Sequence, residues 1–219
     1  MNDDTTETAL RDAGLNDEQV RFTATALSHA AYQMAANGRV PLQAMILSPR
    51  GEGNDPALMM LACPLVEDDD TKNMFMETVR YMAHRENSET VGILMEAWTA
   101  PDGTHEEIAA MLEKYGSIGA MPGTGEQISV MVNTVTGCHQ ASIVIERDED
   151  GSLKGFSDVK VVTDSQGEIR GRMMHSRYTP DEVADPAFAQ RTAFMDAYLQ
   201  GRMVDIAPDE GEEKEAKPH

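Results

Sequence analysis

The stretch ISVMVNTVTGCHQASIVIERDEDG, residues 128–151, decides the fold class. Apolar side chains alternate at Ile128, Val130 and Val132, which is the period of a half-buried strand. The run ASIVIE at 141–146 predicts a second strand, and RDEDG at 147–151 is typical of a turn. Two strands in direct succession, with no helix between them, favour an antiparallel sheet.

Further strands are expected on both sides of this stretch, at 42–47, 57–65, 90–99, 155–162 and 168–175. Cap residues and apolar spacing predict helices over about 17–37, 68–87, 104–115 and 179–201. The helix over 104–115 is expected to bury Ile108, Leu112 and Tyr115. The predicted fold class is α+β, a mostly antiparallel mixed sheet with helices packed on it, in the order α-β-β-α-β-α-β-β-β-β-α.

The 219 residues are expected to form one domain. Residues 1–9 are polar and are predicted to be a loose N-terminus. The domain itself is expected over 10–204. Residues 205–219 are rich in Glu and Lys without apolar anchors, which predicts a disordered acidic tail.

The net charge of −20 limits the classes of partner. The first twenty residues contribute −5 and residues 205–219 contribute −4, so −11 lies on residues 21–204, within the domain. Such a field repels phosphate backbones and anionic bilayers, so neither nucleic acid nor a membrane is expected as a partner. Three explanations of the charge stay open: solubility or adaptation to a salty habitat, mimicry of DNA, and a basic protein partner. Self-association is a further candidate interaction.

The N-terminal sequence MNDDTTETAL has no basic start and no apolar run, so no signal peptide is expected. Cys63 and Cys138 lie too far apart in sequence to form a CxxC motif, and two thiols make no disulfide framework. A cytoplasmic location with reduced thiols is therefore predicted.

The glycine-rich segment GSIGAMPGTGE, residues 116–126, is a candidate binding loop. It lacks the Lys of a phosphate-binding loop, and a strand follows it instead of a helix. No nucleotide or other cofactor is therefore expected. The segment is either a mobile connection or a lid or binding loop, whose candidate residues are Gly119, Gly123, Gly125 and Glu126.

Glu96 is the leading candidate for a catalytic residue, because it interrupts the apolar strand ILMEAW. Burial beside Trp98 would raise the pKa of its carboxyl group, which suits a general acid. A hydrogen bond to a neighbouring Arg, or a solvent-facing position with Trp98 lying over it, explains Glu96 equally well. His139 and His175 are candidate catalytic partners. The histidines show no metal-ligand spacing, so no metal is expected.

The region from Thr90 to Gly151 resembles a family of bacterial and phage proteins of unassigned activity. The resemblance lies in a strand ending Glu96-Ala97-Trp98, a variable loop, the strand GEQISVMVN, and a strand running into ERDEDG. In that family the loop carries a Pro, an Arg and a Glu. Pro122 and Glu126 match the first and last of these, and the Arg is missing here. The resemblance implies a small standalone protein of bacterial or mobile-element origin.

Two functions are therefore expected as alternatives. The first is a non-enzymatic binding or accessory protein that acts through its acidic surface. The second is a small hydrolase-like enzyme that uses Glu96 with His139 and His175. The enzyme requires these side chains to converge, and a separation above about 10 Å excludes hydrogen bonding even through one water.

Overall fold

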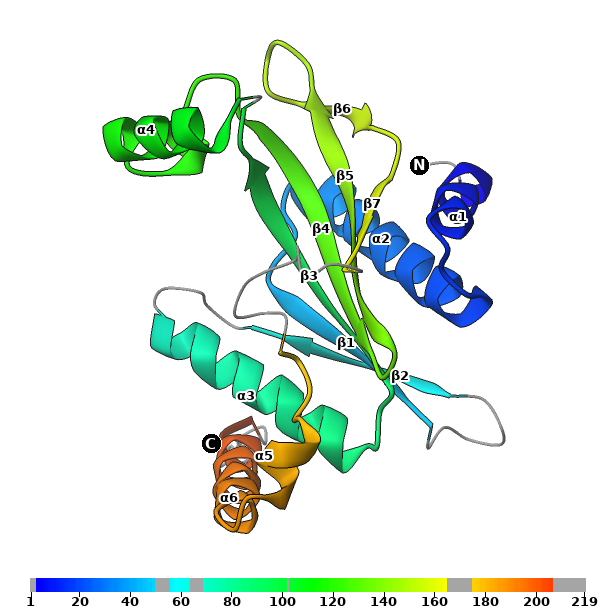
Figure 1. The fold of residues 1–219 in the computed structure, drawn as a ribbon, viewed down its shortest axis with the longest axis vertical. Coiled ribbons are helices and arrows are strands. Elements are labelled where there is room, and N and C mark those ends of the chain that lie inside the picture. The colour runs from blue at the N-terminus through cyan, green and yellow to red at the C-terminus, as the bar shows by residue number, and fades with distance from the viewer. Residues whose placement is uncertain (1–2, 50–55, 64–68, 102, 165–174, 207–219) are drawn as a thin grey trace, which may run out of the picture. The chain divides into compact units, whose positions relative to one another are not determined.

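The computed structural model describes residues 3–49, 56–63, 69–101, 103–164 and 175–206 (Figure 1). The chain divides into two compact units, Met1–Arg177 and Tyr178–His219. Each unit is described by itself below. The α+β class predicted from the sequence is confirmed.

A seven-stranded sheet forms the centre of the first unit, and every strand pairing in it is antiparallel. Its strands are β1 (Gln43–Ser48), β2 (Ala57–Ala62), β3 (Thr90–Thr99), β4 (Gly125–Thr134), β5 (Gly137–Arg147), β6 (Leu153–Phe156) and β7 (Lys160–Thr163). The order across the sheet is β2-β1-β3-β4-β5, and both β6 and β7 pair with β5. Strands β1 and β2 pair with each other as an antiparallel hairpin.

The helices of this unit are α1 (Asp3–Asp12), α2 (Asp17–Asn37), α3 (Asp69–Arg85), α4 (His105–Tyr115) and a short 3₁₀ turn, η1 (Ile118–Ala120). Helix α2 begins at the predicted capping box. The Asn16 side chain accepts a hydrogen bond from the Gln19 N–H at 2.9 Å, and the Gln19 side chain accepts one from the Asn16 N–H at 3.0 Å. Gly38 ends the helix in the left-handed conformation, with φ 71°.

Two apolar cores cover opposite faces of the sheet because strand side chains alternate. Leu94 of β3 belongs to the core formed with α2, together with inward residues of β4 and β5. Val91 and Ile93 of the same strand belong to the core formed with α3. Figure 1 shows these two helices flanking the sheet.

The structure differs from the sequence prediction at three places in the first unit. Residues 3–12 form helix α1, with Leu10 fully buried in the core of α2, although a loose N-terminus was expected over 1–9. The single strand expected over 155–162 is two short strands, β6 and β7, that pair with different parts of β5. The strand expected over 168–175 lies, except for His175, outside the described residues.

The second unit contains α5 (Pro180–Ala184) and α6 (Phe188–Ile206). Thr179 caps α5 through a capping box with Glu182. The Tyr178 ring meets the Phe188 ring edge-on at 5.0 Å, and the Arg191 guanidinium lies 5.2 Å from the Tyr178 ring centre. The sequence predicts one domain over 10–204, whereas the contacts separate at Arg177. Of the tail predicted over 205–219, only Asp205 and Ile206 are described, and both belong to α6.

No helix in the described part of the chain has the length and apolar character needed to cross a bilayer.

The contact between α2 and β3 generates a stability prediction at Gly92. A Cβ at this position would lie 2.7 Å from Cε1 of the Phe22 ring, so Gly92→Ala forces this buried ring, or the helix that carries it, to shift. We expect a loss of about 1–3 kcal/mol in the free energy of unfolding, measured by urea denaturation. Gly155→Ala is the matched control, because a Cβ there meets nothing within 4 Å. Equal stability of the two variants would contradict the close packing of α2 on β3.

Candidate functional site

The candidate site lies where β3 ends and β4 begins. Trp98 of β3 stands opposite Glu126 of β4 in the strand register. A hollow of about 190 Å³ opens here, lined by Gly38, Glu96, Ala97, Trp98, Glu126 and Arg147. The structure thus brings together two residues that the sequence placed in separate candidate sites, Glu96 and Glu126.

The end of helix α2 explains why this part of the sheet is open. Leu94, Glu96 and Trp98 project from the same face of β3 by strand alternation. Leu94 is fully buried in the core formed with α2. The helix ends at Asn37, and Gly38 turns the chain away. The next two positions on that face, Glu96 and Trp98, are therefore exposed, and half of Trp98 (50%) is accessible to solvent.

An ion pair between Glu126 and Arg147 closes one side of the hollow. The Arg147 Nε donates to Glu126 Oε2 at 2.7 Å, and Arg147 Nη2 donates to the same oxygen. Arg147 Nη1 also donates to the Gly151 carbonyl at 3.2 Å, which fixes the side chain against the β5–β6 turn. The hydrogen bond with Glu126 raises the pKa of Arg147, so this group stays charged.

The Glu96 carboxyl group has a raised pKa. Partial desolvation is the largest cause, even though the residue as a whole is solvent-exposed. A hydrogen bond from the Val40 backbone opposes this change, the charge of Glu126 adds to it, and Arg147 and Arg39 oppose it. Glu96 is thus a carboxylate whose electrostatic environment is set by the same residues that line the hollow.

The glycines of the predicted binding loop support Trp98. A Cβ at Gly119 would lie 2.9 Å from Nε1 of the Trp98 indole, so only glycine lets η1 pack against the ring. A Cβ at Gly125 would lie 2.8 Å from the Thr99 hydroxyl, which bonds the Gly125 N–H at 3.1 Å. Gly123 has φ +81°, which favours glycine, and lies beside Pro101. These glycines therefore hold the turn close to the end of β3.

Helix α4 exposes the apolar side chains that the sequence predicted to be inward. Leu112 is 44% exposed and Tyr115 is 36% exposed, so their predicted burial is wrong. None of the α4 side chains that the structure describes is buried. The physical reason is that α4 contacts η1 but packs on neither face of the sheet. Its apolar stripe therefore remains on the surface.

Acidic residues crowd the same end of the sheet. Strand β5 ends at Arg147, and four exposed acids surround that residue in sequence: Glu146, Asp148, Glu149 and Asp150. The β3–β4 and β4–β5 registers place this end of β5 beside Glu126. The exposed ring of Trp98 thus lies at an end of the sheet that carries several exposed acidic residues.

His139 has a structural role. It is 3% exposed, and its Nε2 lies 2.8 Å from the Thr23 hydroxyl of α2. Burial lowers its pKa to about 4, so the imidazole is neutral at pH 7. His139 is a catalytic candidate in the sequence analysis, whereas in the structure it links β5 to α2.

The catalytic set predicted from the sequence is not assembled. Glu96 pairs with Ile128, which pairs with Ile143, and His139 lies four residues before Ile143 on β5. Two strand spacings and four residues of strand separate Glu96 from His139 by about 16 Å. His175 is exposed and lies outside the strands. Burial also raises the pKa of Cys138 to about 11, so its thiol is protonated and weakly nucleophilic.

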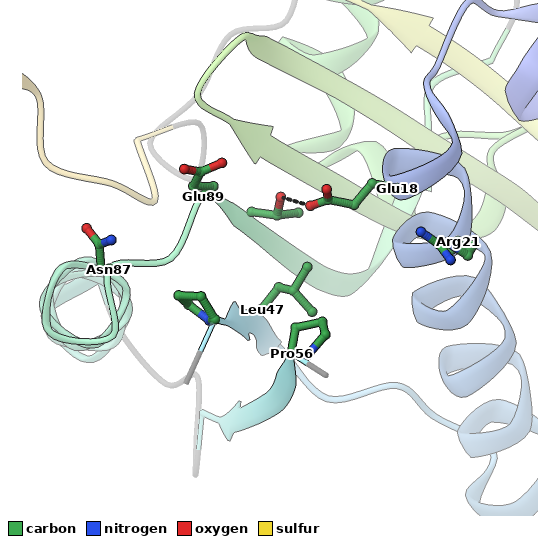
Figure 2. A pocket seen from close by; sticks show the side chains of 8 residues that line it. Glu18, Arg21, Leu47, Pro56, Asn87 and Glu89 are labelled. Atoms are coloured by element: carbon green, nitrogen blue, oxygen red, sulfur yellow. Dashed lines mark hydrogen bonds between the residues drawn. The ribbon is translucent and has the colours of Figure 1, made fainter. Parts of the chain in front are cut away.

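A larger cavity of about 380 Å³ lies between α2 and the ends of β1 and β3, lined by Glu18, Arg21, Leu47, Pro49, Pro56, Asn87, Glu89 and Thr90 (Figure 2). The Thr90 hydroxyl donates to Glu18 at 3.4 Å across it. A neighbouring groove of about 240 Å³ shares four of these residues and adds Phe22, Thr25, Met45 and Leu58. Sequence patterns did not indicate either cavity, because their residues come from separate elements.

Arg147 lines the candidate site and was not among the site residues predicted from the sequence. The sequence does contain one feature that could have indicated Arg147, because it is the single basic residue within the acidic run 146–150. In the described residues, no group of three or more His, Cys, Asp and Glu side chains is arranged to hold a metal ion. The chemical groups that characterise the hollow are the charged side chains of Glu96, Glu126 and Arg147 and the indole ring of Trp98.

The comparison with known proteins gives two partial similarities. The chain is 25% identical over 128 residues to the heat-inducible transcription repressor HrcA of Bartonella tribocorum (strain CIP 105476 / IBS 506), covering 55% of this chain and 35% of the repressor. It is 26% identical over 128 residues, with the same coverage, to the repressor of that name from Bartonella quintana (strain Toulouse). The chain thus spans about a third of the length of these relatives. No family model and no solved structure matches it.

His139 generates a prediction of pH dependence. The imidazole titrates at about 4 in the folded chain, below its ordinary value of 6.5, so the unfolded chain binds more protons between these pH values. The contribution of His139 to the free energy of unfolding is therefore fully present above pH 6.5 and is lost as the pH falls toward 4. The shift corresponds to up to about 3 kcal/mol. We expect His139→Gln to flatten the dependence of the unfolding free energy on pH in this window, measured by urea denaturation.

His175→Gln is the matched control, because His175 is exposed. We expect it to retain the pH dependence of the wild type. A slope that is unchanged in His139→Gln would show that another group causes the acid sensitivity.

The charges around Glu96 generate a second titration prediction. Because Arg147 lowers the pKa of Glu96 and Glu126 raises it, Arg147→Gln should move this pKa upward and Glu126→Gln should move it downward. Carbon-13 NMR titration of the Glu96 carboxyl group measures both changes. Glu113→Gln, an exposed position on α4 that does not line the hollow, is the control. Shifts of the same sign in the Arg147 and Glu126 variants would contradict the described charge arrangement.

Proposed function

We propose that this protein is a non-enzymatic binding protein that docks a basic segment of a protein partner at the Trp98 end of its sheet. The observation that carries the proposal is the half-exposed indole of Trp98, which shares a hollow with the carboxylates of Glu96 and Glu126. A cation above an aromatic ring gains about 0.5–2 kcal/mol, depending on how far it is desolvated. Adjacent carboxylates add a hydrogen-bonded charge partner.

The local charges favour a basic ligand. The two carboxylates and the one guanidinium of the hollow leave a net charge of −1. The acidic residues around Arg147 extend the negative potential, and the chain as a whole carries −20. Such a field speeds the encounter with a basic partner and repels acidic ones.

The exposed apolar stripe of α4 favours a protein over a small cation. Leu112 and Tyr115 are half-exposed large side chains on a helix that packs on neither core. Apolar side chains surrounded by charged ones are typical of protein interfaces. A partner segment that combines Lys or Arg with apolar residues would fit both features.

The alternative enzymatic function receives less support. A hydrolase-like enzyme needs Glu96 and His139 within reach of one substrate, and the strand register keeps them about 16 Å apart.

For the location we propose the cytoplasm, because two cysteines give no disulfide framework. The resemblance to bacterial and phage proteins supports a bacterial or mobile-element origin.

The similarity to transcription repressors favours a second candidate, a regulatory protein that acts on DNA. The net charge of −20 opposes this function, because a DNA-binding surface must attract phosphates. We therefore propose that direct contact with nucleic acid is absent, and that any regulatory role runs through the basic partner.

Fluorescence tests the proposed function at the site itself, because Trp98 is the only tryptophan of the chain. The probe is an acetylated and amidated hexapeptide of alternating Lys and Leu, and the same peptide with Glu for Lys is the control ligand. We expect the Lys peptide to change the Trp98 emission, and the effect to weaken as NaCl screens the charges. Glu96→Gln should weaken binding by about threefold, the loss of one exposed charge contact.

Glu113→Gln is the matched variant, an exposed acid of α4 outside the hollow, and it should change the affinity by less than Glu96→Gln. Anisotropy with a labelled 20-base-pair DNA duplex tests the second candidate, and we expect no binding. A response to the Glu peptide equal to that for the Lys peptide, or tight binding of the duplex, would overturn the proposal.

A further inference from the structure

Strand β2 is an edge strand without the usual protection of an edge. It lies at one end of the sheet order, and among the described strands it pairs with β1 alone (Figure 1). Its sequence, ALMMLA, contains no charge, no proline and no glycine. Natural edge strands normally carry such residues, because a bare edge pairs with other strands.

The hydrogen-bond phase of β2 shows which backbone groups face outward. The Cys63 N–H donates to the Leu42 carbonyl at 2.9 Å, so Cys63 and every second residue before it, Leu61 and Met59, bond to β1. The N–H and C=O groups of Leu58, Met60 and Ala62 therefore point away from the sheet. The side chains of Leu58 and Met60 are each 42% exposed.

From this arrangement we infer that β2 pairs antiparallel with β2 of a second copy of the chain, about a two-fold axis at Met60. Every residue of ALMMLA is apolar, so the pairing places no charge opposite another within the strand. In this register Met60 faces Met60 of the other copy and Leu58 faces Ala62, which uses all the outward backbone groups. Another protein would need a matching strand, whereas the second copy supplies one by symmetry.

Charge does not prevent this contact, despite the acidity of the chain. Strand β2 is neutral, and the groove beside it is lined by one acid, Glu18, and one base, Arg21. The strand and the groove lining therefore bring no net charge to the contact, and the exposed acids Asp69 and Asp70 follow the strand in sequence. Repulsion between the rest of the two chains acts at longer range, so added salt should strengthen the association. Salt has the opposite effect on the basic partner proposed for the Trp98 site.

The area available indicates a weak dimer. A pair of six-residue strands covers less than the roughly 1,200–2,000 Å² that stable complexes bury. Leu47 and Leu58, the partly exposed apolar residues that line the groove of about 240 Å³, extend the contact. We expect a dissociation constant in the range of about 10–100 µM.

Sedimentation velocity of the full chain over about 1–300 µM tests the inference, together with two cysteine variants. Met60→Cys should form a disulfide-linked dimer under copper phenanthroline, because position 60 faces itself across the axis. Leu58→Cys, on the same face and equally exposed, should not, because position 58 lies about 13 Å from its symmetry mate. The wild type controls for Cys63 and Cys138.

Met60→Lys should shift the chain to the monomer, and Val162→Lys should not. Val162 lies on β7 and is 46% exposed, close to the 42% of Met60. Val162→Lys therefore adds the same charge as Met60→Lys and replaces a similarly exposed apolar side chain. The inference is overturned if the wild type stays monomeric throughout this range, if both cysteine variants cross-link equally, or if Val162→Lys alone removes the dimer. None of these outcomes depends on ligand binding at Trp98.

Discussion

The pairing of β3 with β4 is the interaction on which the rest of the structure depends. It runs from Thr90 opposite Thr134 to Thr99 opposite Gly125, without interruption. One half of this pair carries the side chains that α2 and α3 cover. The other half continues past the end of α2 and presents Glu96, Trp98 and Glu126 to solvent. A single ladder thus holds both the core and the candidate site, and the length of α2 decides where one gives way to the other.

Much of this fold could be predicted from local signals. The alternation at Ile128–Val132 and the Asn16 and Thr104 capping boxes each correspond to an element of the structure, because hydrophobic period and cap chemistry act over a few residues. Helix α1 could not be predicted from an apolar stripe, because its sequence is mostly polar and only two of its described residues, Thr6 and Leu10, are buried. The inward face predicted for α4 was wrong for a related reason. An apolar stripe shows which face of a helix could be buried, but only the packing of the helix against other elements determines whether that face is buried.

The candidate site could be predicted only in part. Glu96 was noticed because a carboxylate interrupts an apolar strand, and Glu126 because it ends a glycine-rich loop. Their meeting depends on the register of Trp98 with Glu126, and alternation alone does not determine a register between strands. Arg147 joins them from a third strand, 21 residues from Glu126. His139 was assigned to catalysis because its burial, and the lowered pKa that follows, come from contacts with α2 that no local pattern records.

The central claim is that the chain works by docking a basic segment on the Trp98 end of its sheet. Chemical-shift mapping by nitrogen-15 NMR, with the Lys peptide added to the full chain, tests it most directly. The account predicts that the largest changes fall on the Trp98 indole N–H and on the amides of Glu126 and Arg147, which line one hollow. Changes that spread evenly over the acidic surface, or that centre on His139 or on β2, would contradict it.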